Sequence, residues 1–370
     1  MSIMNKLNVK GSDGLITAKA PGKLYIAGEY AVVETGFPAI IVALNQFVTV
    51  SIEESQEYGS IVSKQYQENS LYWQRQGDEM VFDNRDNPFH YILSAIKLTE
   101  QYARQAGKKL SIYHLRVNSD LDSADGKKYG LGSSAAVTVA TVKALCAFYE
   151  LELTNDQLYK LAAIAHLDVQ GNGSLGDIAA SVYGGWIAYR SFDKQWLAET
   201  RPTMTLNELL AIPWPSLSIE LLTPPVELSL LIGWTGSPAS TSHLVDKIAL
   251  AKTERQADYQ NFLKASKACL EDMVAGFRAN NLQQIQTELR HNRVLLQELA
   301  DFSHVAIETP VLQKMGALAE EAGGAAKTSG AGGGDCGIVI IDRAIDTTSL
   351  FEKWRDNQIE RLNLAVHLVD

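Results

Sequence analysis

The chain has 370 residues, of which 46% are hydrophobic and 21% are charged, and these proportions are typical of a globular protein. Its formal net charge of −10 argues against a nucleic-acid-binding protein, in which we would expect a basic stripe. The length exceeds that of one ordinary hydrophobic core and predicts two domains.

Nothing in the sequence predicts passage through a membrane. It has no leading apolar stretch and no run of about 18 apolar residues, so we expect neither a signal peptide nor a membrane span. The three cysteines, Cys146, Cys269 and Cys336, show neither a disulfide framework nor metal-ligand spacing. They predict small buried thiols in a reducing compartment, and we therefore expect a cytoplasmic protein without a membrane partner.

The first part of the chain is predicted to be rich in strands. A polar hairpin or loop region at residues 64–82 and a helix over residues 89–106 interrupt them. The predicted strands cover residues 15–18, 24–26, 39–52 and 110–117. The last of these strands leads the chain toward a glycine-rich loop.

That loop, residues 129–136, precedes a predicted helix over residues 135–149. Gly130 and Gly132 let the backbone approach a ligand closely, and the free N–H groups at the start of a helix favour an anion, above all a phosphate. Ser133 and Ser134 add hydroxyl groups suited to a phosphate oxygen or a Mg²⁺ ion. The simpler interpretation is that these residues only cap the helix.

A capping-box pattern at residues 154–157 predicts a helix that runs to about residue 170. The next segment, residues 171–181, contains the dinucleotide pattern Gly-x-Gly-x-x-Gly. That fingerprint requires a strand before it and a long helix after it, whereas here a helix precedes it and only a short stretch follows. We therefore expect no nicotinamide cofactor. Neither a Walker lysine motif nor the His-Arg-Asp motif of protein kinases occurs, which disfavours other nucleotide-binding folds.

The composition changes after a proline cluster at residues 213–225, and we place a domain boundary at residue 224. Beyond it the pattern predicts the order β-α-β-β-α-β of a ferredoxin-like domain, with extra helices between residues 240 and 322. The predicted strands are 228–233, 325–329, 336–341 and 362–368, and the last helix covers residues 347–357.

Three segments, taken in chain order, carry a resemblance to a known family. The first motif, residues 19–30, places Lys23 after a Pro-Gly turn at the head of an apolar strand. The second is the loop at residues 129–136, here named the phosphate loop, and the third motif is a glycine-rich loop at residues 327–337. Together they resemble the GHMP kinase superfamily of galactokinases and homoserine, mevalonate and phosphomevalonate kinases. Gly-Glu-Tyr in the first motif and Gly-Gly-Gly-Asp-Cys in the third are most similar to the phosphomevalonate kinase branch, since mevalonate kinases usually have Gly-Glu-His.

The resemblance implies an α+β protein with the two-domain GHMP kinase fold. Residues 1–224 would form a ribosomal protein S5 domain 2-like domain with the phosphate loop, and residues 225–370 a ferredoxin-like domain. It also implies a Mg²⁺-dependent transfer of the ATP γ-phosphoryl group to 5-phosphomevalonate, in isoprenoid precursor synthesis. The alternatives are a mevalonate kinase or another small-molecule kinase of this family, a diphosphomevalonate decarboxylase, and a non-catalytic sensor. A monomer and a homodimer both stay open.

The same resemblance implies roles for individual residues. Asp177 matches the aspartate that faces the acceptor oxygen, and Lys23 matches a lysine that would pair with it, lower its pKa and offset charge on the transferring group. Since a phosphate acceptor is already ionised, we expect Asp177 to orient it more than to remove a proton. The residues expected to bind ATP are Lys127, Lys128, Gly130, Leu131, Gly132, Ser133, Ser134 and Ala135, with Ser134 also as the Mg²⁺ ligand. The residues expected at the acceptor are Lys23, Tyr30, Ser174, Asp177, Ser237, Ser240, Arg290, Arg293, Ser329, Gly330 and Ala331.

Simpler interpretations stand beside several of these roles. Lys23 has the pattern of a surface lysine after a turn, and Asp177 that of a helix N-cap. Arg290 and Arg293 are three apart and share a helix face, which either holds an anion or is merely solvated. His166 occupies the place where mevalonate kinases have a metal-binding glutamate, yet it also fits an ordinary helix histidine.

Overall fold

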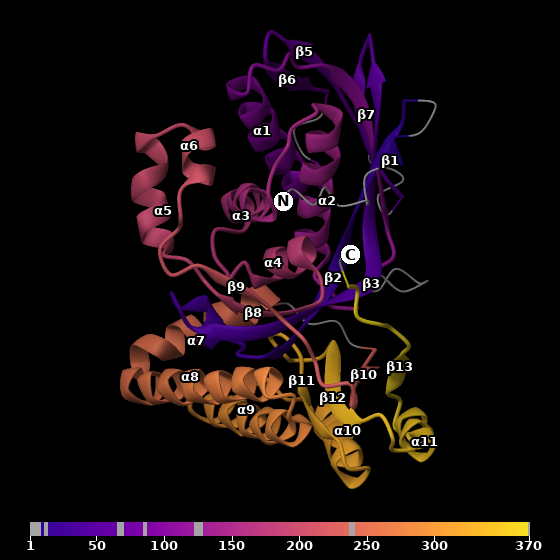
Figure 1. Ribbon diagram of the computed structural model, residues 1–370, viewed down its shortest axis with the longest axis vertical. Coiled ribbons are helices and arrows are strands. Elements are labelled where there is room, and N and C mark those ends of the chain that lie inside the picture. The colour runs from indigo at the N-terminus through magenta and orange to yellow at the C-terminus, as the bar shows by residue number, and fades with distance from the viewer. Residues whose placement is uncertain are drawn as a thin grey trace.

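The computed structural model describes residues 9–10, 14–64, 70–83, 87–121, 129–236 and 241–368. Over these residues the chain forms two sheets, each with its own helices (Figure 1). The last strand of the first sheet ends at Leu222 and the first strand of the second begins at Leu228. The two-domain α+β fold expected from the sequence is confirmed.

The first sheet has nine strands over the described residues, in the order β1-β2-β3-β7-β4-β5-β6, with β8 paired to β3 and β9 to β8. Residues 39–44 of the long strand β3 are all apolar and buried. Their side chains point alternately to the two faces of the sheet, and both faces are covered here. The strands are β1 (Val9–Lys10), β2 (Ile16–Ala27), β3 (Pro38–Ser55), β4 (Gly59–Ser63), β5 (Leu71–Gln76), β6 (Glu79–Phe82), β7 (Ile112–Ser119), β8 (Trp186–Arg190) and β9 (Ser218–Leu222).

Strand β2 corrects one expectation. We expected separate strands at residues 15–18 and 24–26, but one strand continues through the Pro-Gly pair. The register against β3 shifts between Pro21 and Lys23, as in a β-bulge. A bulge accommodates a proline that lacks an N–H, so the strand bends at this point and places Lys23 beyond it.

Helices α2 and α4 lie against β2 and β3, and α1 and α3 form a further layer over α2 (Figure 1). The predicted helices over residues 89–106, 135–149 and 155–170 are confirmed, including the Thr154–Gln157 capping box. The helices of this domain are α1 (His90–Gln105), α2 (Ser133–Phe148), α3 (Asn155–Gln170), α4 (Gly176–Tyr183), α5 (Lys194–Thr200) and α6 (Leu206–Ala211), with a 3-10 turn η1 (Ala31–Val33).

The second sheet is antiparallel, in the order β11-β12-β10-β13, which is the strand order of a ferredoxin-like fold. The long antiparallel helices α8 and α9 pack against each other beside it (Figure 1). The strands are β10 (Leu228–Trp234), β11 (Ala325–Thr328), β12 (Cys336–Asp342) and β13 (Glu360–Leu362). The helices are α7 (Thr241–Glu254), α8 (Gln256–Arg278), α9 (Leu282–Ser303), α10 (Pro310–Glu321) and α11 (Thr348–Asp356).

The end of the chain differs from the prediction. We expected a strand over residues 362–368 in the second sheet, but β13 ends at Leu362 and the chain then crosses to the first sheet. There the Asn45 N–H donates to the Ala365 carbonyl at 2.9 Å, and the His367 N–H donates to the Ala43 carbonyl at 2.9 Å. The C-terminal segment therefore ties the two domains together, using backbone groups of β3 that would otherwise be unpaired.

Cys146, Cys269 and Cys336 are free and buried, which confirms the expectation of buried thiols. Among the helices of the described residues, none is both long and apolar enough to cross a bilayer.

Candidate active site

A cavity of about 590 Å³ lies where the three motifs meet. Its wall is formed by the end of β2, the start of α2, the loop before α4 and the loop after β11. The residues expected at the site that line it are Lys23, Tyr30, Gly130, Gly132, Ser133, Ser134, Ser174, Asp177, Ser329, Gly330 and Ala331. Segments more than 300 residues apart in sequence thus share one cavity.

The phosphate loop is held in a conformation that needs glycine. Gly130 and Gly132 have φ angles of 78° and 79°, in the left-handed region. A Cβ on Gly132 would lie 2.8 Å from Cε of Lys23, so the glycine also lets this lysine pack across the loop. Gly132 is the N-cap of α2, and the first-turn N–H groups of that helix have no intrahelical acceptor. Together with the helix dipole they make this wall suited to an anion.

Two of the expected ATP-binding residues do not line the cavity. Leu131 and Ala135 are buried and do not line the cavity with their side chains. The Leu131 carbonyl accepts a hydrogen bond of 2.8 Å from the Lys23 N–H, which fixes the phosphate loop to β2.

His166, on α3, reaches the start of α2. Its Nε2 lies 3.2 Å from Oγ of Ser134, and its ring stacks on Tyr91 with centroids 4.8 Å apart. Burial lowers the pKa of His166, and the nearby Asp177 carboxylate opposes this in part. Its Nδ1 is buried and has no hydrogen-bond partner among the described residues. A neutral imidazole therefore holds the Ser134 hydroxyl in place at the cavity wall.

Asp177 lies in the first turn of α4, whose N-cap Leu175 is left-handed with φ 63°. The preceding Ser174 anchors this turn. Its Oγ lies 2.7 Å from the Tyr25 hydroxyl and accepts the Gly176 N–H at 3.2 Å, and its carbonyl accepts the Tyr189 hydroxyl. Burial first, and then the Asp177 charge, raise the pKa of Tyr25 well above its usual range. The turn that carries Asp177 is therefore anchored, and its carboxylate lies near buried tyrosines that stay neutral.

The expected ion pair between Lys23 and Asp177 is not formed. Both residues line the cavity, but none of the ion pairs among the described residues joins them. The Lys23 ammonium instead lies 5.3 Å from the ring centroid of Tyr25. The two charges thus face the same space from different walls, which leaves room for a reacting group between them.

The third motif lies beside the other two motifs. The Tyr30 hydroxyl donates to the Ala331 carbonyl at 2.6 Å, and the Ser329 hydroxyl donates to the Tyr25 carbonyl at 2.8 Å. On the phosphate-loop side, a Cβ on Gly130 would lie 2.6 Å from the Asp335 carboxyl group. The glycines therefore serve both the cavity wall and the close approach of the two domains.

A buried ion pair joins the first and third motifs. Lys327, which is fully buried, donates to Oε1 of Glu29 at 2.5 Å, and the Gly330 N–H donates to the same oxygen at 3.2 Å. Oε2 of Glu29 is buried without a partner among the described residues, and Glu29 lines the cavity. We did not single out this pair from the sequence, although both residues lie in the motifs, because 298 residues separate them.

The two arginines expected at the acceptor lie elsewhere. Neither Arg290 nor Arg293 lines the cavity. Arg290 pairs with Glu320 and Arg293 with Glu308, each at 2.7 Å, because this face of α9 turns toward acidic side chains. The expected residues that lie outside the described part of the chain are Lys127, Lys128, Ser237 and Ser240.

Comparisons with known proteins agree with this arrangement. Residues 90–185 match the family GHMP kinases N terminal domain, and residues 273–359 match GHMP kinases C terminal. Phosphomevalonate kinase of Streptomyces sp. (strain CL190) is 36% identical over 351 residues, covering 92% of this chain and 94% of that protein.

Two solved structures are also similar. The Lin0012 protein from Listeria innocua is 38% identical with a TM-score of 0.91, and the match covers 96% of this chain and 99% of that one. Streptococcus pneumoniae phosphomevalonate kinase in complex with phosphomevalonate and AMPPNP is 33% identical with a TM-score of 0.83, covering 95% of this chain and 100% of that one.

Proposed function

Since this chain belongs to the GHMP kinase family, we propose that it is a phosphomevalonate kinase, which transfers the γ-phosphoryl group of ATP to (R)-5-phosphomevalonate and releases 5-diphosphomevalonate and ADP. The observation that carries the proposal is one cavity that combines a helix N-terminus for an anion with Lys23 and Asp177. The likeness over nearly the whole length to phosphomevalonate kinases supports the choice of acceptor.

The division of work among the residues follows from the chemistry. Phosphoryl transfer needs the two phosphates in line and their charge offset, with little covalent work from the protein. The N–H groups of the phosphate loop bind ATP phosphates, and Lys23 lies across that loop, where charge develops on the transferring group. Asp177 orients the acceptor, whose phosphate oxygen is already an anionic nucleophile. Ser329, Gly330 and Ala331 close the acceptor side.

The cavity also fits a Mg²⁺ ion bound together with ATP. Its described lining holds three carboxylates, Glu29, Asp177 and Asp335, but no lysine or arginine other than Lys23. Glu29 is paired with the buried Lys327, but ATP would bring several negative charges to this wall, and a divalent cation would offset them. Mg²⁺ prefers oxygen ligands and commonly uses few protein groups besides phosphates and water. Ser134 Oγ is the group that would hold it, with Asp177 nearby, and the ion would neutralise charge on the β- and γ-phosphates.

The test is ADP release by a coupled assay, with mevalonate and 5-phosphomevalonate offered in parallel and CO₂ release followed in the same samples. Turnover with 5-phosphomevalonate alone and without CO₂ supports the proposal. Turnover with mevalonate alone would move the chain to the mevalonate kinase branch. CO₂ release from 5-diphosphomevalonate would make it a decarboxylase, and ATP binding without turnover would make it a sensor.

Asp177→Asn separates chemistry from binding. It should lower kcat by at least about 100-fold and affect ATP affinity far less, because the role proposed for the carboxylate is to orient the acceptor. Asp168→Asn is the matched control, since Asp168 pairs with Arg201 on the surface. Full activity of Asp177→Asn would remove this residue from the mechanism.

A further inference from the structure

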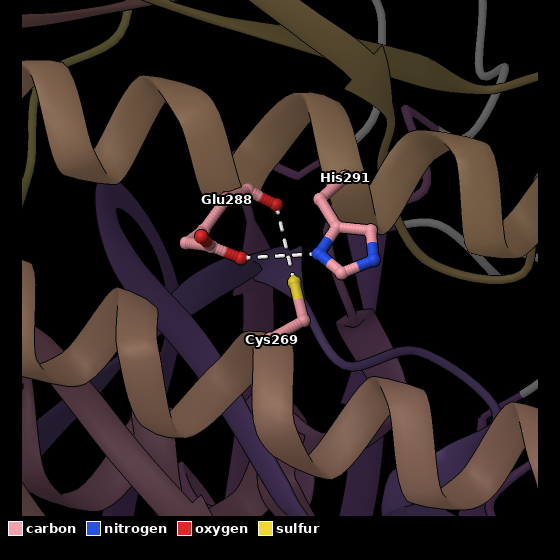
Figure 2. A group of neighbouring side chains, drawn as sticks. All are labelled: Cys269, Glu288 and His291. Atoms are coloured by element: carbon pink, nitrogen blue, oxygen red, sulfur yellow. Dashed lines mark hydrogen bonds and ion pairs between the residues drawn. The ribbon is translucent and has the colours of Figure 1, made fainter.

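A second cluster of reactive side chains lies between helices α8 and α9, apart from the residues that line the cavity. Figure 2 shows Cys269 of α8 pointing toward Glu288 and His291 of α9. One ligand atom of each residue lies within 4.8 Å of the other two. The described residues hold no other group of three or more His, Cys, Asp or Glu residues with such spacing.

The present contacts keep these atoms close. The Cys269 thiol donates to the Glu288 backbone carbonyl at 3.2 Å, and Nδ1 of His291 lies 3.2 Å from Oε2 of Glu288 (Figure 2). Glu288 and His291 are three apart and therefore share one face of α9. The facing helix supplies the thiol, because α8 and α9 pack along much of their length.

We propose that Cys269, Glu288 and His291 form a zinc site, with water as a fourth ligand, which is separate from the phosphoryl-transfer cavity. A thiolate, an imidazole and a carboxylate are the three ligand types that Zn²⁺ takes in proteins, whereas Mg²⁺ prefers oxygen alone. Three protein ligands with one open position match the geometry of an accessible zinc ion. The ligands are brought together by the packing of α8 against α9, and the proposal does not depend on the kinase reaction.

Access to the site is one-sided. The Cys269 residue is 1% exposed, the Glu288 side chain 16% and the His291 side chain 49%, so an ion enters from the His291 side. The Cys269 thiol donates a hydrogen bond to the Glu288 carbonyl, so without metal it carries a proton.

The proton balance of binding follows from these contacts. As the S–Zn bond forms, the Cys269 S–H bond breaks and its proton passes to solvent. In the metal-free protein Nδ1 of His291 donates its proton toward the Glu288 carboxylate. On binding, this proton passes to solvent while Nε2 takes one up, so that the Nδ1 lone pair and the Glu288 carboxylate both become available to the ion. About one proton should therefore be released per zinc bound.

The experiment is a titration of the full-length protein, freed of metal with EDTA and without nucleotide, with Zn²⁺ and in parallel with Co²⁺. Isothermal titration in two buffers of different ionisation enthalpy gives the stoichiometry and the protons released. We expect one Zn²⁺ per chain, about one proton released, and a thiolate-to-cobalt absorption band, which an oxygen site such as that for Mg-ATP does not produce.

Variants assign the ligands. His291→Ala should weaken zinc binding by at least about 100-fold, since even residues that only hydrogen-bond to a metal ligand change metal affinity by 10–100-fold. Its matched control is His90→Ala, an exposed histidine at the start of α1. Cys269→Ser should abolish the cobalt band, whereas Cys146→Ser, at a buried cysteine on α2, should retain it. Kinase activity of His291→Ala reports that the protein is folded.

Three results would overturn the proposal. The first is the absence of saturable zinc binding to the wild-type protein. The second is equal zinc affinity in wild type and in folded His291→Ala. The third is a cobalt spectrum without a thiolate band, which would place the metal on other ligands. None of these outcomes depends on which acceptor the enzyme phosphorylates.

Discussion

The Glu29–Lys327 pair is a buried charged link between the two domains. Lys327→Met keeps most of the side-chain volume and removes the charge. The Glu29 carboxylate would then stay buried with a single described donor, the Gly330 N–H. Removal of one partner from a buried ion pair costs about 3–5 kcal/mol, because the remaining charge is uncompensated. We expect a loss of that size in the free energy of unfolding.

A double variant shows whether the loss comes from the orphaned charge. In Glu29→Gln/Lys327→Met the buried group is neutral and its amide oxygen still accepts the Gly330 N–H. The double variant should therefore be more stable than Lys327→Met by at least about 1 kcal/mol. The matched control is Lys353→Met, because Lys353 forms an exposed pair with Glu321 at 3.0 Å. Breaking this exposed pair should lower the free energy of unfolding by less than about 1 kcal/mol.

The assay is urea unfolding of five proteins at pH 7, followed by circular dichroism and by tryptophan fluorescence: the wild type, Glu29→Gln, Lys327→Met, the double variant and Lys353→Met. The reasoning fails if Lys327→Met costs no more than Lys353→Met. It also fails if the double variant loses the sum of the two single losses, since the charges would then act independently.

Three further predictions concern other parts of the molecule. Ser134→Ala should lower kcat/KM for Mg-ATP by about 10- to 100-fold, which is the expected effect of losing one hydrogen bond or ligand to a charged group. Unchanged steady-state kinetics would exclude a role for Ser134 in nucleotide binding. Burial lowers the pKa of Lys143 to about 8, so its folded form binds fewer protons than the unfolded chain between about pH 8 and pH 10.5, and stability rises with pH there. Lys143→Met should therefore stabilise the protein by about 3 kcal/mol in urea unfolding at pH 7, with the gain fading toward pH 10.5. Arg293→Ala should cost about 3 kcal/mol by breaking its largely buried pair with Glu308, with KM unchanged for both substrates; a selective rise in the acceptor KM would restore the substrate-binding role expected from the sequence.

Local sequence signals predicted the elements that carry the site. The Thr154–Gln157 capping box fixed the start of α3, and therefore the position of His166 three turns later. Gly130 and Gly132 marked the phosphate loop because a left-handed backbone favours glycine. These features depend on residues a few positions apart, and such short-range chemistry is visible in one sequence.

Contacts between distant segments were not visible in the same way. The spacing of Arg290 and Arg293 correctly placed them on one helix face, but not the acidic groups that this face meets. The last residues of the chain looked like a strand and do form backbone hydrogen bonds, yet with the first sheet instead of the second. Alternating apolar residues predict that a segment pairs, and they leave the partner undetermined.

The charges along the described wall of the cavity bear on how it would hold phosphate. Three carboxylates and one lysine line its described wall, and the whole chain carries a formal charge of −10. Along this described wall, Lys23 and the backbone N–H groups are the donors for phosphate, and the partial charges of the N–H groups are fixed in place. A divalent cation carried in with ATP would supply further positive charge, and the site would then become more attractive to the phosphorylated acceptor once the nucleotide is bound. On this argument the affinity for 5-phosphomevalonate should rise when Mg²⁺ and a non-hydrolysable ATP analogue are present, and equal affinity with and without them would show that the acceptor finds its cations in the protein itself.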